Sequence, residues 1–142
     1  MASKREDILD AIKTALAGTT GVSTRIYRSR TIPLAQRSEL PALIIEWTGD
    51  SAEQNTSLPT LDWSLNVRVS VLSSGDVPDE VADPTVVSMH AKMMADLTLG
   101  GEAIDIQPSN VSFESIDGDQ PIGVIGCEYI VRYRTQVDDL SA

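Results

Sequence analysis

The side chains of this sequence that are able to do chemistry are few and stand apart from one another. It has a single histidine, His90, and a single cysteine, Cys127. A zinc site needs several nitrogen or sulfur ligands at short spacings, and no such ligand accompanies His90. A nucleophilic triad would require His90 to act on Ser88 or Cys127, but no nucleophile elbow is present. We interpret His90 as a partly buried packing histidine and Cys127 as a small buried hydrophobic residue.

Carboxylates are abundant, but their positions do not predict an acid and base pair. Asp79 and Asp83 fall in predicted turns, where solvent surrounds them. The Asp-Gly-Asp at 117–119 resembles the start of a calcium loop, but Gly123 and Ile125 stand where later ligands are required. The glycine-rich stretches lack the lysine and the spacing of phosphate-binding loops. We therefore expect no enzymatic activity, no cofactor and no metal site.

Charge is distributed unevenly along the chain. The formal net charge of -10 argues against nonspecific binding to nucleic acid, which relies on Lys and Arg. The first 37 residues are nevertheless net positive, whereas from Glu39 to Glu128 only Arg68 and Lys92 oppose a long series of carboxylates. A protein with one basic and one acidic region can attract copies of itself head to tail. The alternative is that both regions are solvated surface.

A strict alternation of apolar and polar residues runs from 61 to 71. This period of two predicts an extended strand with all its apolar side chains on one face. At roughly 3.3 Å per residue such a strand spans on the order of 35 Å, so its ends are expected to project past the core as part of a hairpin. The apolar positions are Leu61, Trp63, Leu65, Val67, Val69 and Val71.

Two helices are predicted. Ser3 and Glu6 form a capping box before the first helix, and Gly18 follows it. Asp83 is the expected cap of the second helix, with Pro84 at its first position and its end near Leu97. The expected buried face of this second helix holds Val86, His90, Met93 and Leu97, flanked by Met89 and Met94.

The remaining segments complete an α+β domain. Residues 25–30 and 40–48 read as strands, 49–59 as a polar hairpin arm, and residues near 111–113 and 125–133 as later strands. We expect one domain, 1–142, with two helices packed on one face of a mostly antiparallel mixed sheet, a long β-hairpin arm, and a flexible tail at 135–142. The charged N-terminus and the lack of a long apolar run predict a soluble protein made in the cytoplasm, without a membrane segment.

The order and spacing of these segments resemble the tail terminator family of long-tailed phages, with the U-type minor tail protein of lambda-like phages as the nearest pattern. The resemblance covers most of the chain. It is carried by the capped first helix, the strand at 40–45, the polar arm and the strand that starts near Asp62-Trp63. It continues with the sequence Val77-Pro78-Asp79 before a helix and with the last strand, at 128–133.

This resemblance implies a homo-oligomer, a ring of six copies, at the head-proximal end of the tail. Such a hexameric ring caps the last ring of the tail tube protein, stops polymerisation, and meets a head-tail connector or stopper protein. It assembles in the host cytoplasm and stays in the virion, with DNA only as passing cargo in the lumen and no membrane partner.

Charge suggests where copies would touch. We hypothesise that Arg25, Arg28, Arg30 and Arg37 of one subunit face Asp50 and Glu53 of the next. Asp117 and Asp119 are candidates for an acidic pore lining along which DNA slides without sticking.

Two alternatives remain open at this point. A head completion or stopper protein would stabilise filled heads instead of ending tubes. A small ligand-binding or regulatory domain would use the same fold, and would need a concave apolar pocket with converging polar groups.

Overall fold

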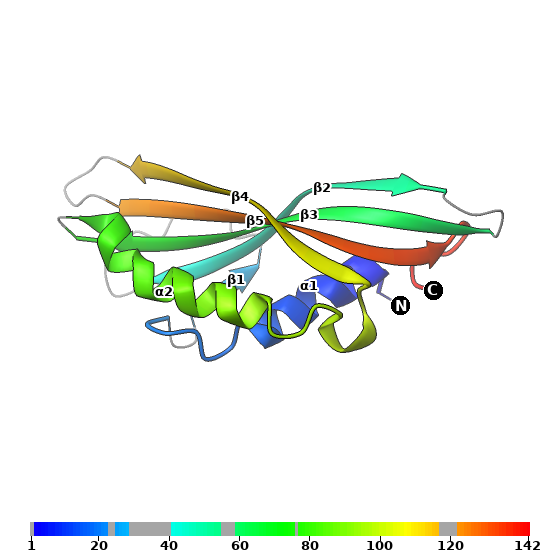
Figure 1. Cartoon of the computed structure of the whole chain (residues 1–142), viewed down its shortest axis with the longest axis horizontal. Coiled ribbons are helices and arrows are strands. Elements are labelled where there is room, and N and C mark those ends of the chain that lie inside the picture. The colour runs from blue at the N-terminus through cyan, green and yellow to red at the C-terminus, as the bar shows by residue number, and fades with distance from the viewer. Residues whose placement is uncertain (1, 23–24, 29–40, 55–58, 76, 117–121) are drawn as a thin grey trace.

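Two helices lie on one face of a five-stranded sheet (Figure 1). The computed structural model describes residues 2–22, 25–28, 41–54, 59–75, 77–116 and 122–142. The sheet order is β1-β2-β3-β5-β4, with β1 parallel to β2 and every other neighbouring pair antiparallel. The predicted α+β class is confirmed. The elements are α1 (Lys4–Ala15), β1 (Ile26–Arg28), β2 (Ala42–Glu53), β3 (Thr60–Ser74), α2 (Pro78–Met93), the short 3₁₀ helix η2 (Leu99–Gly101), β4 (Asp105–Ile116) and β5 (Ile122–Gln136).

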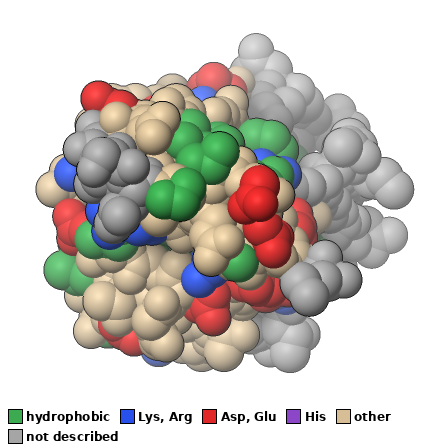
Figure 2. Space-filling view, turned by 90° about the vertical axis from the view of Figure 1, so that its right-hand side faces the viewer, with side chains coloured by type: hydrophobic (Ala, Val, Ile, Leu, Met, Phe, Trp, Pro, Cys, Tyr) green, Lys and Arg blue, Asp and Glu red, His purple; other side chains and the backbone are tan. Residues whose placement is uncertain are grey.

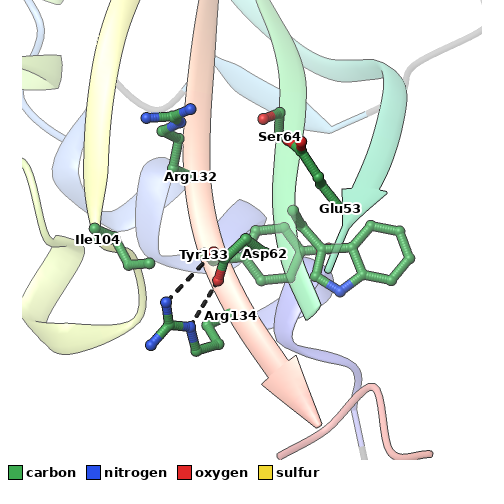
Figure 3. Close-up of a pocket in the computed structure, with 8 residues that line it drawn as sticks. Glu53, Asp62, Ser64, Ile104, Arg132, Tyr133 and Arg134 are labelled. Atoms are coloured by element: carbon green, nitrogen blue, oxygen red, sulfur yellow. Dashed lines mark hydrogen bonds and ion pairs between the residues drawn. The ribbon is translucent and has the colours of Figure 1, made fainter. Parts of the chain in front are cut away.

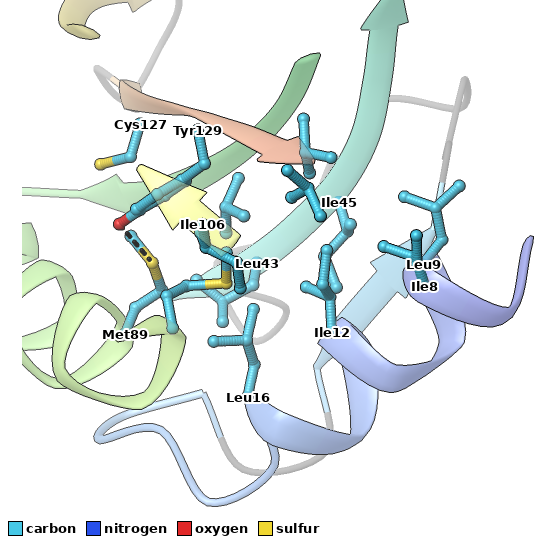
Figure 4. Close-up of a cluster of buried hydrophobic side chains, with 14 of the residues drawn as sticks. Ile8, Leu9, Ile12, Leu16, Leu43, Ile45, Met89, Ile106, Cys127 and Tyr129 are labelled. Atoms are coloured by element: carbon cyan, nitrogen blue, oxygen red, sulfur yellow. Dashed lines mark hydrogen bonds between the residues drawn. The ribbon is translucent and has the colours of Figure 1, made fainter. Parts of the chain in front are cut away.

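The core fills the space between the helices and one face of the sheet (Figure 4). The alternation in β3 is confirmed, because Leu65, Val67, Val69 and Val71 are all fully buried. The apolar stripe of α1 packs onto the same face. Burial of one large aliphatic side chain contributes about 1.5–3 kcal/mol to the stability of the fold.

The start of α1 follows its sequence signals. The backbone N–H of Glu6 donates to Ser3 Oγ at 3.2 Å, which satisfies one free donor of the first turn. After the helix, Gly18 has a φ of +83°, a left-handed conformation that glycine adopts without strain.

The start and the phase of α2 differ from the sequence prediction. The helix begins at Pro78 and ends at Met93, so Asp83 is not its cap and Pro84 lies inside it. Its buried residues are Ala82, Thr85, Met89 and Met93, whereas His90 is exposed. In this phase Thr85 faces inward, and its hydroxyl donates to the carbonyl of Thr20 at 2.9 Å.

The β2–β3 hairpin is longer and more regular than the predicted polar arm. The two strands pair from Ala42↔Leu72 out to Glu53↔Asp62, with one irregularity between Trp47 and Gly49. Residues 49–53, predicted as part of a polar hairpin arm, are therefore strand. Figure 1 shows this hairpin and the end of β5 projecting beyond α1, and the β4–β5 hairpin at the opposite end.

The two termini meet near the projecting β2–β3 hairpin (Figure 1). The N–H of Lys4 donates to the carbonyl of Leu140 at 2.8 Å, and that of Gln136 donates to the carbonyl of Ala142 at 2.8 Å. The predicted tail thus includes the last residues of β5 and a turn that is hydrogen-bonded to the start of α1. Neither helix in the described part of the chain is long and apolar enough to cross a membrane.

Candidate interaction surfaces

His90 and Cys127 border one open groove between α2 and β4. Nδ1 of His90 lies 2.8 Å from the Tyr129 hydroxyl, and the two rings stack with centroids 5.8 Å apart. Burial raises the pKa of the Cys127 thiol, which disfavours the reactive thiolate. The groove has a volume of about 260 Å³ and an apolar floor.

The described residues contain no group of three His, Cys, Asp or Glu side chains placed to hold a metal ion.

A polar clasp, formed by Arg5, Asp50 and Tyr133, joins α1 to the projecting hairpin. Asp50 accepts a hydrogen bond from the Tyr133 hydroxyl and lies 3.7 Å from the Arg5 guanidinium. The Asp50 side chain is only 4% exposed. Burial raises the pKa of Asp50, against the opposing effects of Tyr133 and Arg5. The carboxylate therefore depends on these two partners to stay ionised.

A β-bulge at Thr48 aims Asp50 into the clasp. Before it, Trp47 pairs with Val67, and after it Asp50 pairs with Leu65, so an even-numbered residue of β2 now faces the helices. The Arg5 guanidinium also lies over the Trp47 ring, 4.4 Å from its centroid. A strictly alternating strand would have placed Asp50 on the opposite face, in solvent.

An aromatic side chain packs against the Tyr133 ring of the clasp. Trp63 stacks on Tyr133 with centroids 6.1 Å apart and planes 11° apart, and its indole N–H donates to Thr135 Oγ1 at 2.9 Å. The sequence signal for this contact was the aromatic residue near the start of the long strand. Its partner Tyr133 lies seventy residues away, so the pairing became visible only in the fold.

The other face of the sheet carries charged cross-strand pairs at the same end. Arg134 Nε donates to Asp62 Oδ1 at 2.6 Å, and the pair borders an open hollow of about 210 Å³ (Figure 3). Arg132 and Glu53 line the same hollow. Further along the sheet, Arg68 pairs with Glu128 at 3.2 Å. These exposed pairs are typical of a solvated sheet face.

Strand β4 exposes apolar side chains on the helix side of the sheet. Val111 is 65% exposed and Phe113 is 50% exposed, and they pair across the ladder with Cys127 and Ile125. α2 packs beneath β3 and β5, and of the apolar residues of β4 Ile106 is buried in the core whereas Val111 and Phe113 stay exposed. The end of the molecule that holds the termini also mixes exposed apolar and acidic side chains (Figure 2). Val137 and Leu140, each 48% exposed, lie in the C-terminal turn.

The arginines proposed for a subunit contact lie near the β1 edge as far as they are described. The Arg25 side chain donates to the carbonyls of Pro41 and Gly21, at 2.9 and 2.8 Å. Arg28 binds Glu6 and Asp10 of α1, at 3.0 and 2.8 Å. Arg30 and Arg37 lie outside the described residues.

The acidic residues predicted for contacts have different environments. Glu53 is exposed at the end of β2, whereas Asp50 is held in the clasp. Contact of Asp50 with another subunit would therefore require the clasp to open. Asp117 and Asp119, the predicted pore residues, lie outside the described residues, in the connection between β4 and β5. The interface and pore assignments stay predictions.

No family model matches the chain, and no curated protein matches it. Among solved structures, the chain is similar to a protein in the virion of a native gene transfer agent particle. The identity is 11%, the TM-score is 0.44, and the match covers 94% of this chain and 92% of the other. A match at this level does not assign a function.

Proposed function

We propose that this protein is a structural virion protein that forms a ring on the head-proximal end of a phage tail tube. The ring ends tube polymerisation and offers the surface to which the head joins. The order of elements expected from the resemblance to tail terminators supports this proposal, as do the surfaces of the molecule.

The observation that carries the proposal is that the sheet has open edges on opposite sides. At one edge, β4 pairs only with β5. At the other, β1 covers β2 only at Leu43, Ile44 and Ile45, which leaves Glu46–Glu53 without a second neighbour among the described strands. Two different edges allow head-to-tail contacts, and such contacts close into a ring when the rotation between copies permits.

Charge is compatible with this geometry. The described arginines Arg25 and Arg28 lie beside the β1 edge, and the sequence places Arg30 and Arg37 in the segment that follows. These residues form the proposed basic side of the contact. Glu53 is the accessible member of the proposed acidic side, and Asp50 would join it only with the clasp open.

Two hollows on the described surface are small for a ligand-binding site. Their volumes, about 210 and 260 Å³, lie below the roughly 300–1,000 Å³ that is usual for a small-molecule site. Both are open to solvent. The connection between β4 and β5, which carries Asp117 and Asp119, remains our proposal for the pore lining, where like charge would keep DNA from adhering.

The test is a tube-length assay. The tail tube protein of the same phage is allowed to polymerise with and without this protein, and tube lengths are measured by electron microscopy. A terminator shortens the tubes and stops their growth in proportion to its concentration. Unchanged tube lengths would refute the proposal, and stabilisation of DNA-filled heads in the same experiment would favour a stopper protein instead.

A further inference from the structure

We propose that strand β4 and the groove beside it accept an extended segment of the next copy of this chain, residues 30–37. The inference rests on the proposed function, because it supplies the contact between neighbours in the ring. It also assigns the contact to one strand that accepts the segment, called the acceptor, and to one segment that is inserted, called the donor.

The acceptor is an edge strand with an apolar side. Residues 107–115 of β4 are exposed, and apart from Pro108, which has no N–H and precedes an irregularity in the pairing with β5, their outward N–H and C=O groups have no strand partner within the described part of the chain. Val111 and Phe113 are two residues apart, on the side of the sheet that faces α2. Between them and α2 lies the 260 Å³ groove, bordered by Val86 and His90. An added strand would satisfy the edge and cover both apolar side chains.

The acceptor is also acidic at one end. Asp79, Asp83, Val86 and His90 recur at helical spacing, so the two carboxylates continue the stripe of α2 that borders the groove. Both are exposed, and neither has an ion-pair partner among the described residues. An occupant with positive charge beside apolar residues fits this surface.

The sequence of residues 30–37 has that chemistry. It reads Arg-Thr-Ile-Pro-Leu-Ala-Gln-Arg, with an arginine at each end. In an extended chain Ile32 and Leu34 share one face, with the same two-residue spacing as Val111 and Phe113. Pro33 has no N–H, and it fits at the position between them whose backbone points away from β4. Eight extended residues span roughly 23 Å from first to last, close to the length of the exposed part of β4.

The donor and the acceptor lie on opposite edges of the sheet. The segment follows Arg28 in β1 and precedes Ala42 in β2, whereas the acceptor is β4, with β2, β3 and β5 between β1 and β4. Four strand spacings of about 4.8 Å separate the two edges. The helices cover the face between them (Figure 1). Head-to-tail packing of copies would bring the β1 side of one copy, and the segment that follows β1, to the β4 edge of the next copy.

The experiment measures binding of a fluorescent peptide of residues 29–38 to the full chain by anisotropy. The acceptor protein carries Arg30→Glu and Arg37→Glu, so that its own segment does not compete. We expect saturable binding that weakens at least tenfold in the acceptor variant Phe113→Ser and at least threefold, at low salt only, in Asp79→Asn with Asp83→Asn. Val137→Ser, which changes an exposed valine in the C-terminal turn, is the matched control and should leave binding unchanged.

Two peptide variants test the strand pairing. N-methylation at Ile32 removes a donor that faces β4, whereas N-methylation at Thr31 removes one that faces away. Only the first should abolish binding. Equal loss with both peptides, equal binding to Phe113→Ser and the control, or no saturable binding would overturn the inference.

The tube-length assay separates this inference from the proposed function. The full chain with Ile32→Ser and Leu34→Ser should fail to shorten tubes while keeping its circular dichroism spectrum. If that variant caps tubes like the wild type, the inference is overturned and the function stands. If the peptide binds as expected but the wild-type protein does not shorten tubes, the contact stands and the terminator function fails.

Discussion

Replacing Tyr133 with Phe removes one hydroxyl from the clasp and leaves the aromatic packing in place. The lost group donates to Asp50, whose side chain is 4% exposed and whose other oxygen, Oδ1, is buried without a hydrogen-bond partner among the described residues. A hydrogen bond to a charged group contributes about 1.5–3 kcal/mol. The ring of Phe still stacks on Trp63. We therefore expect Tyr133→Phe to lower the free energy of unfolding by about 2 kcal/mol at neutral pH, roughly a thirtyfold change in the folding equilibrium.

The loss should depend on pH in a defined direction. Burial raises the pKa of Asp50 in the folded protein above its unfolded value, so protonation favours the folded state and stability from this group increases as pH falls through the folded pKa. Tyr133 acts against that shift, and the Phe variant should raise the pKa further. Once Asp50 is protonated, the hydroxyl contacts a neutral acid, and the cost of Tyr133→Phe should fall to about 1 kcal/mol at an acid pH below the pKa of Asp50 in the folded protein.

Urea unfolding followed by tryptophan fluorescence measures this effect at both pH values. A double-mutant cycle with Asp50→Asn isolates the contact, and we expect a coupling of about 1 kcal/mol at neutral pH. A loss below about 0.5 kcal/mol, or a loss that grows as the pH falls, would refute the reasoning that a buried carboxylate holds the hairpin against α1.

Three further predictions concern packing and surface charge. Gly123→Ala should destabilise the fold by about 2 kcal/mol in thermal or urea unfolding. The reason is that the new Cβ would lie 2.5 Å from Pro78 Cβ and 3.1 Å from Phe113 Cε1. In the control Gly49→Ala the new Cβ meets nothing closer than 3.8 Å, so stability should change by less than about 0.5 kcal/mol. Leu65→Ala, at a fully buried site, should cost about 3 kcal/mol, and Leu97→Ala, at a site 39% exposed, under about 1 kcal/mol; equal losses would contradict the assigned core. The exposed pair Asp62–Arg134 should show a coupling below about 1 kcal/mol that disappears in high salt, and a coupling above about 2 kcal/mol would mean that the pair is shielded from solvent.

Much of the fold follows from local sequence patterns. The alternation in residues 61–71 and the capping residues around α1 depend on near neighbours, and these elements formed where they were expected. The second helix shows the limit of such signals. Asp83-Pro84 has the local pattern of a helix start, but Val77-Pro78 offers another, and contacts of Ala82 and Thr85 with distant parts of the chain favour the earlier one.

The clasp could not be predicted from the sequence, for a different reason. Its three members come from α1, β2 and β5, and a single bulge at Thr48 decides which face Asp50 occupies. In the sequence, Asp50 is therefore one of the acidic residues of a polar hairpin arm, with no signal that it is buried. The length of β4 was also hidden, because only Val111 and Phe113 mark it in the sequence, and pairing with β5 extends it to twelve residues.

We propose that copies of this chain join edge to edge into a closed ring on a tube end. Electron microscopy with averaging of the ends of tubes grown with this protein would show such a ring. We expect a closed ring of several copies on one end of each tube, with β4 of each copy against its neighbour. Bare tube ends, or single copies bound without contact between them, would contradict it.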